Sequence, residues 1–317
     1  MKNLPKYKIL VTAAGMAILV LLLSFVKTAN AQEMMRSITI NPTVAHALNP
    51  GQNAEGTINL INNGASPLTF SVDLRDFIIV DKNGTPNLLP PDSLNQKYSA
   101  SAWIGITPDS FTVGAHQKQE IHYYIQVPPD ARPGGHYAAV VYTPTVPKGG
   151  LVTGTTVTTQ VGTLFYITVN GPVKEQASVT KFFTDLLHEY GPVNILTEIT
   201  NYGDLHIKPI GTVTVSNMLG KKEVQNIGEG NIFPGGAARD YNNLFGGKFM
   251  IGRYEASLVA SYGKDNNLPL VASFTFWVFP WKITILLILI VVAIILGIRY
   301  QKTRKGHHKE EAPEAAE

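Results

Sequence analysis

Three histidines, His116, His122 and His136, lie close together in the chain and are the first candidates for metal chemistry. A zinc ion needs three or four ligands that converge at about 2 Å, and no two of these histidines have the tight spacing of a zinc motif. The chain has no cysteine, so it also lacks thiolate ligands, disulfides and a cysteine nucleophile. We therefore interpret His122, on the polar face of its strand, as a solvated residue and predict no metal site.

Acidic residues supply two further candidate sites. The segment 81–84 (Asp-Lys-Asn-Gly) matches the opening of a calcium loop, but Pro90 occupies the position of the bidentate glutamate. We therefore predict a hairpin turn there, since Asp, Asn and Gly favour turns. Asp73 and Asp76 could act together in acid–base catalysis, but their spacing places them on opposite faces of a strand. We predict no acid–base pair.

The chain carries no motif of the common hydrolases. It contains no G-x-S-x-G and no H-E-x-x-H segment. The glycine-rich segment 149–154 is not followed by a Lys-Ser/Thr pair, so we do not interpret it as a phosphate-binding loop. We predict that the protein is not an enzyme and has no catalytic residue and no cofactor.

Binding is the remaining class of site. Trp103 could stack on a sugar ring, but its neighbours Ile104 and Ile106 favour a place in the core. The loops predicted at 81–97 and 144–159 are the candidate binding regions, since binding residues are often found on loops. No motif in either loop identifies a ligand.

Short alternating segments separated by turn residues must position all of these side chains. In 118–127, the residues Ile121, Tyr123, Ile125 and Val127 fall on one face and polar residues occupy the other. No long stretch between the two ends has the helical period. The strands predicted by this pattern cover 37–40, 55–62, 68–80, 103–106, 118–127, 136–143 and 155–169. Short strands of this number and spacing are typical of an immunoglobulin-like sandwich.

The same plan recurs later in the chain. The segment 60–64 (Leu-Ile-Asn-Asn-Gly) is similar to 199–203 (Ile-Thr-Asn-Tyr-Gly), and Tyr137 and Tyr254 both follow a glycine turn. The segment 170–172 (Asn-Gly-Pro) interrupts the strand pattern between the two copies. We therefore predict an all-β fold of two immunoglobulin-like β-sandwiches in series, at 32–171 and 172–276.

The two ends of the chain carry sequence signals that predict its localisation and membrane topology. Residues 1–31 have the basic start, apolar stretch and small-residue cleavage site of a signal peptide, although the long apolar stretch also fits an uncleaved anchor. Residues 277–298 are long and apolar enough to cross a bilayer as one helix, and Trp277 and Trp281 form an aromatic belt. Basic residues in the tail 299–317 then place the C-terminus in the cytoplasm.

The charge balance argues against a nucleic-acid partner. The chain has 26 basic and 23 acidic residues, for a net charge of +3. The excess of basic residues lies at the two ends, whereas acidic residues outnumber basic ones between 32 and 276. The outer part therefore lacks the positive surface that binds phosphates.

A W-x-x-x-x-P segment runs from Trp103 to Pro108, and turn residues recur at 127–129 (Val-Pro-Pro) and 133–137 (Pro-Gly-Gly-His-Tyr). With the signal peptide, the two sandwiches, the span and the basic tail, this layout resembles the WxL-interacting surface proteins of Gram-positive bacteria. The first domain is also similar to that of periplasmic pilus chaperones, whose paired basic residues have no clear counterpart here. The WxL resemblance implies a membrane-tethered adaptor that binds peptidoglycan with its first domain and proteins with its second.

Three functions remain open from the sequence. The leading hypothesis is a non-catalytic protein of the plasma membrane, outside the cell except for its tail, that binds cell-wall polymer or another surface protein through loops or an unpaired sheet edge. The alternative is an assembly subunit of a membrane-associated envelope complex, although the span, with Ala293 and Gly297, has no G-x-x-x-G face. The third is an enzyme with an unrecognised carboxylate site at Asp73, Asp76 and Asp81.

Overall fold

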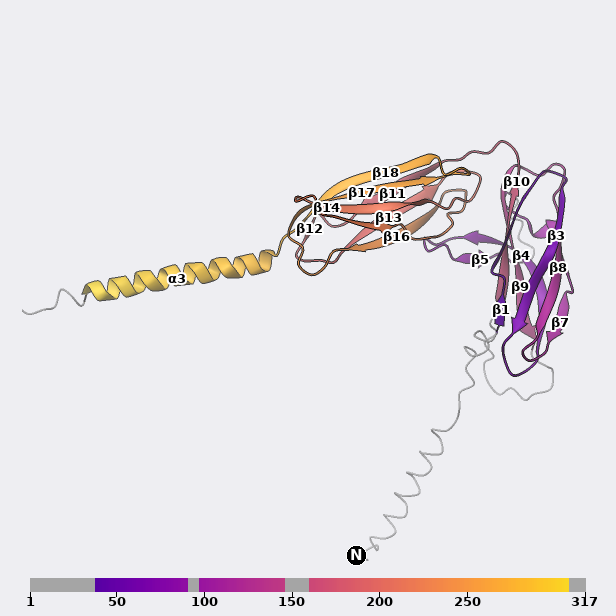
Figure 1. Cartoon of the computed structure of the whole chain (residues 1–317), viewed down its shortest axis with the longest axis horizontal. Helices are drawn as coiled ribbons and strands as arrows, with labels where there is room; N and C mark the ends of the chain where they lie inside the picture. Colours follow the sequence, from indigo (N-terminus) through magenta and orange to yellow (C-terminus); the bar gives the residue numbers. More distant parts are fainter. Residues whose placement is uncertain (1–37, 91–96, 146–159, 308–317) are drawn as a thin grey trace, which may run out of the picture. The chain divides into compact units, whose positions relative to one another are not determined.

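The computed structural model describes residues 38–90, 97–145 and 160–307, and the side chains of these residues up to 302 (Figure 1). These residues are mostly β-strand, with one long apolar helix at the C-terminal end, as predicted. The predicted signal peptide 1–31 lies outside the described residues, as do the parts of the candidate loops at 91–96 and 146–159 and the end of the tail.

The described residues form two compact units that are not continuous in sequence. The first contains residues up to Asp76, together with Pro90–Ala131 and His136–Ile167. The second contains Phe77–Leu89, Arg132–Gly135 and the chain from Thr168 onward. Two short segments from the first half of the chain therefore belong to the second unit. The predicted domain limits of 32–171 and 172–276 stay predictions.

Two sheets build the first unit. The first sheet has the order β1 (Ile38–Ile40), β3 (Asn53–Asn62), β8 (Lys118–Gln126) and β6 (Ile104–Thr107). The second has the order β2 (Thr43–Leu48), β10 (Val161–Val169), β9 (Gly134–Thr145), β4 (Leu68–Ile79) and β5 (Pro86–Leu88), with β7 (Ser110–Val113) also paired to β4. Each predicted strand has a counterpart here, with bounds that differ by a few residues where they are described; residues 155–159 of the last one lie outside the described residues. The strands β2, β5 and β7 were not predicted.

The alternation of β8 places the core of this unit as expected. Ile121, Tyr123, Ile125 and Val127 are all buried, while Lys118, Glu120, His122 and Gln126 are exposed. Because successive side chains point to opposite faces of a strand, one face of β8 packs inward and the other meets solvent. The ring of Tyr123 packs edge-on against that of Phe165 from β10, at 5.1 Å between centroids.

The second unit repeats this architecture with different sheets. One sheet has the order β11 (Ala177–Phe183), β13 (Val193–Asn201) and β16 (Ala237–Phe245). The other has the order β12 (Leu187–His188), β18 (Leu268–Val278), β17 (Gly252–Tyr262), β14 (Ile210–Asn217) and β15 (Lys222–Asn226). Buried residues from both sheets, among them Ile195, Ile199, Phe245 and Phe276, form one apolar cluster.

A buried asparagine closes the same turn in each unit. The amide nitrogen of Asn62 donates to the carbonyl oxygens of Ser66 (2.8 Å) and Val113 (3.2 Å), and its side-chain oxygen accepts from Gly64 N–H (2.9 Å). Asn201 does the same with Leu205 (2.7 Å), Ile232 (2.9 Å) and Gly203 N–H (2.9 Å). The predicted similarity of 60–64 and 199–203 is therefore a shared hydrogen-bonding device.

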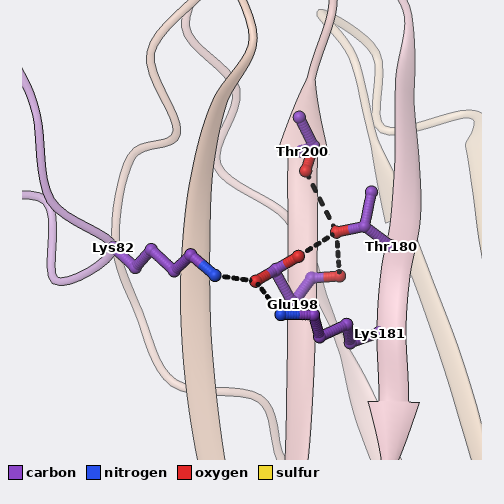
Figure 2. A network of polar contacts seen from close by, with 5 residues as sticks. All are labelled: Lys82, Thr180, Lys181, Glu198 and Thr200. Carbon is purple, nitrogen blue, oxygen red and sulfur yellow. Dashed lines mark hydrogen bonds and ion pairs between the residues drawn. The ribbon is translucent and has the colours of Figure 1, made fainter.

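A carboxylate network holds the hairpin 77–89 within the second unit (Figure 2). This hairpin joins the end of β4 to β5 (Pro86–Leu88), so the predicted turn at 81–84 is confirmed. Lys82 at its tip bonds to Glu198 on β13. Lys181 Nζ on β11 lies 3.2 Å from the same carboxylate, and the Thr180 hydroxyl donates to it at 2.7 Å.

These contacts set the ionisation of Glu198. The carboxyl is 8% exposed, and its burial alone would raise its pKa. The ammonium of Lys82, then the hydroxyl of Thr180 and the ammonium of Lys181, outweigh burial and lower the pKa of Glu198 from 4.5 to about 2. Glu198 is therefore charged at neutral pH, although it lies almost entirely inside the protein.

The strand β16 is the edge of its sheet, and two of its outward backbone groups have partners. The N–H of Asp240 donates to the carbonyl oxygen of Lys82 at 3.0 Å. The carbonyl oxygen of Leu244 accepts from the side-chain nitrogen of Gln225 at 2.7 Å. The long edge of this sheet is thus only partly open.

The helix α3 runs from Trp281 to His307 and follows β18 after two residues (Figure 1). Its segment Trp281–Lys302 is long and apolar enough to cross a membrane, and none of the most apolar part is buried in the protein. The helix begins later than the predicted residue 277, because Trp277 and Val278 still pair with Arg253 and Gly252 in the sheet.

Candidate functional site

The three predicted histidines do not converge. His136 is buried, and its Nδ1 lies 3.0 Å from the carbonyl oxygen of Ser99. His122 is exposed, with Nδ1 3.5 Å from the hydroxyl of Thr57, and His116 lies in a turn with φ of 56°. Within the described residues, no group of three or more histidine, aspartate or glutamate side chains could hold a metal ion.

The three candidate carboxylates do separate structural work. Asp73 pairs with Arg75 at 2.6 Å. Asp81 accepts the N–H of Thr85 at 2.8 Å, and this hydrogen bonding lowers the pKa of Asp81. The buried Asp76 accepts from the backbone N–H groups of Ala100 (3.1 Å) and Ser101 (2.9 Å) and from the Ser99 hydroxyl. No two of them face each other as an acid–base pair would.

An open depression of about 470 Å³ lies on the outer face of the first unit, where β3, β8 and β6 adjoin. Two aromatic residues, two amide residues and two prolines give it its chemical character. Its lining consists of Gly51, Asn53, Ala102, Trp103, Ile104, Tyr124, Gln126, Val127, Pro128 and Pro129. A neighbouring depression of about 440 Å³ shares Asn53, Tyr124 and Gln126 with it and adds Glu55. We call these two together the aromatic depression.

Tyr124 is the most exposed aromatic residue of this site, at 58%. It stands on the polar face of β8, opposite Glu55 of β3 on one side and Gly105 of β6 on the other. A Cβ atom at Gly105 would lie 1.9 Å from the Tyr124 ring, so the missing side chain lets the ring lie over β6. An aromatic residue among polar neighbours on a strand face was the sequence signal for this residue, and the prediction missed it.

Trp103 is half-buried rather than a core residue, because it ends the short turn η1 (Ser101–Trp103) just before β6. Its ring packs against that of His136, with 4.3 Å between the centroids. The Asp76 carboxylate accepts hydrogen bonds from the backbone N–H groups of Ala100 and Ser101, and these bonds fix the turn that ends at Trp103. The half-buried tryptophan therefore lines the depression from a turn whose backbone is held in place.

The polar groups around the two rings are uncharged amides and one carboxylate. Asn53 and Gln126 are cross-strand partners in the register of β3 and β8, and both are exposed. Amide side chains both donate and accept hydrogen bonds, and a carboxylate accepts them. A concave surface that combines aromatic rings with a few polar groups can hold the apolar face of a ligand and bind its hydroxyl groups.

No protein-family profile and no curated relative matches the chain. Among solved structures, it is similar to a chaperone–tip adhesin complex of CFA/I fimbriae, with 12% identity over 74% of this chain and 97% of the other, at a TM-score of 0.40. The CupB2 chaperone of Pseudomonas aeruginosa is 10% identical over 74% of this chain and 97% of its own, at a TM-score of 0.37. The DraB chaperone of E. coli is 14% identical over 76% of this chain and 96% of its own, at a TM-score of 0.34. At TM-scores below 0.5, these likenesses support no inference about this chain.

Proposed function

We propose that this protein is a non-catalytic binding protein, anchored to the plasma membrane by α3, whose first unit binds the carbohydrate polymer of the cell wall. The observation that carries the proposal is the aromatic depression, where the rings of Trp103 and Tyr124 stand beside the amides of Asn53 and Gln126. Sugar rings have one apolar face that stacks on aromatic residues and a rim of hydroxyl groups that amides recognise.

The membrane part of the proposal rests on α3. The segment Trp281–Lys302 has the length and composition of a span, and basic residues cluster at its C-terminal end and directly after it, at Arg299, Lys302, Arg304 and Lys305. The positive-inside rule then directs the tail to the cytoplasm and the two units to the outside. Membership of the WxL-interacting family would fit this arrangement and stays a prediction.

The proposal is tested by co-sedimentation of the full chain, reconstituted in nanodiscs, with washed cell-wall sacculi across a salt series. We expect saturable binding that survives high salt. The variant Tyr124→Ala should weaken this binding about tenfold, which corresponds to the loss of about 1.4 kcal/mol from one aromatic contact. The matched control is Tyr202→Ala, which removes an exposed tyrosine of the second unit and leaves binding unchanged. If Tyr124→Ala binds sacculi as tightly as the wild-type chain, the proposed site is refuted. If the wild-type chain pellets with sacculi no more than empty nanodiscs do, wall binding itself is refuted.

A second variant tests whether binding depends on Gly105, the residue of β6 over which the Tyr124 ring lies. Gly105→Val places a branched side chain where the Tyr124 ring lies, so the ring must move while β6 keeps its strand structure. We expect a loss of sacculus binding similar to that of Tyr124→Ala, with an unchanged melting temperature. Thr107→Val on the same strand is the control, since Thr107 is exposed and does not line the depression. Normal binding by Gly105→Val would show that the position of the ring is immaterial.

A further inference from the structure

Three turns of the second unit lie at the end of the unit from which α3 leaves (Figure 1). The strand registers place them there. Gly252, the first residue of β17, pairs with Val278, the last residue of β18, so the turn 246–251 lies beside that end. Asn217 pairs with Tyr254, which brings the turn 218–221 to the same end. Leu187 pairs with Trp277, which adds the segment 184–192.

These three turns carry large apolar side chains that face solvent. Phe249 is 93% exposed and Leu219 is 92% exposed, and the other members are more than half exposed. We call the set the apolar rim; it consists of Leu186, Leu187, Tyr190, Met218, Leu219, Phe249 and Ile251. Contiguous exposed apolar residues are unusual on a soluble surface and mark a place that contacts another apolar phase.

The opposite end of the same unit has a different surface. Among its described turns, at 202–209, 227–236 and 263–267, and the strand residues next to them, Tyr202 and Ile210 are the large apolar residues with high exposure, against seven at the other end. An ion pair between Lys208 and Glu229, at 2.8 Å, lies at this end. The apolar residues are therefore concentrated at the end that leads into α3, and are not scattered over all the turns.

The connection to α3 is too short to move this end away from the membrane. Only Phe279 and Pro280 separate Val278 from Trp281, and three residue steps reach at most about 11 Å. The N–H of Phe279 donates to the carbonyl oxygen of His188 at 2.7 Å. Lys282, in the first turn of the helix, pairs with Glu189 at 2.6 Å. The segment that bears part of the rim is thus bonded to the start of the span.

We infer that the apolar rim enters the headgroup–acyl boundary of the outer leaflet and gives the second unit its own contact with the lipid bilayer. This inference rests on the proposed membrane anchoring by α3. Aromatic and aliphatic side chains with a neighbouring lysine are what such a boundary accepts, and Lys248 precedes Phe249. Lipid is the occupant because the rim is continuous with the point where the chain enters the bilayer.

The test uses single-cysteine variants of the full chain, which has no native cysteine. Phe249→Cys reports on the rim, Tyr202→Cys on the opposite end of the unit, and Ile290→Cys on the span. Each is labelled with an environment-sensitive NBD fluorophore in vesicles of phosphatidylcholine and phosphatidylglycerol at three to one, with or without lipids that carry a nitroxide near the headgroup. All three replaced side chains are exposed, so labelling does not disturb a core.

We expect the nitroxide lipids to quench the label at 249 at least threefold more than the label at 202. The inference is overturned if the labels at 249 and 202 are quenched equally while the label at 290 is protected from an aqueous quencher, because the span is then in place without the rim. A label at 290 that remains open to the aqueous quencher would instead refute membrane anchoring, and the rim inference would fall with it.

Discussion

Asn201→Ala lowers the free energy of unfolding of the second unit by about 2–4 kcal/mol, the largest effect that we expect from a single substitution. Asn201 is fully buried, and its amide satisfies the carbonyl oxygens of Leu205 and Ile232 and the N–H of Gly203. Alanine leaves these three backbone groups away from water without their partner, and each such group costs about 1–3 kcal/mol before the turn relaxes.

The measurement is hydrogen exchange of the full chain in nanodiscs, read on the amides of β13 and β16 at pH 7. The amides of β8 in the first unit provide an internal reference. The matched control is Asn194→Ala, which removes an exposed asparagine from the same strand and its bond to Asn242. If the amides of β13 and β16 exchange at the same rate in Asn201→Ala as in Asn194→Ala, the buried asparagine does not hold the turn.

Glu198→Gln lowers stability at pH 7 by about 1–3 kcal/mol and removes part of the acid sensitivity of the second unit. Glutamine keeps the size of the side chain but loses the charge that Lys82 and Lys181 neutralise. Both lysines are about half exposed, so solvent weakens each pair and keeps the effect below that of a fully buried ion pair.

The sign of the pH effect follows from the depressed pKa. Because the pKa of Glu198 is about 2 when folded and near 4.5 otherwise, its contribution is fully present above pH 4.5 and is lost as the pH falls toward 2. Melting curves of the wild-type chain and Glu198→Gln should therefore converge between pH 4.5 and pH 2. Glu229→Gln is the control, since its exposed pair with Lys208 should give no measurable change. A constant difference across this range would contradict the ionic role of Glu198.

Local pattern was sufficient to predict the strands with strong alternation. In 118–127 the predicted apolar and polar faces of β8 are those observed, because alternating residues of one strand point to opposite faces and their hydrophobicity indicates which face is buried. The strand β2 (Thr-Val-Ala-His-Ala-Leu) was missed, since its small residues and its histidine give a weak periodic signal. The conspicuous tryptophan, Trp103, was expected in the core, although it ends a turn at the surface.

Contacts between distant segments could not be predicted from one sequence. Lys82 meets Glu198 although 116 residues separate them, and no periodicity relates the two positions. The aromatic depression also arises from contacts between segments that are separate in the sequence. Tyr124 and Trp103 become neighbours only through the pairing of β6 with β8, and Gly105 acquires its role only when Tyr124 stands opposite it. Sequence pattern gives the faces of single strands, whereas a binding surface depends on which strands pair.

If α3 anchors the chain in a bilayer, as we propose, the partners of the β16 edge affect what happens when two copies meet. A protein confined to a bilayer meets copies of itself far more often than one that diffuses in three dimensions, and an open strand is a template for pairing with the next copy. Lys82 and Gln225 occupy the outward groups of Asp240 and Leu244, so an incoming strand would have to displace both before it could extend the ladder. At two positions this edge is therefore protected against pairing with a neighbouring copy.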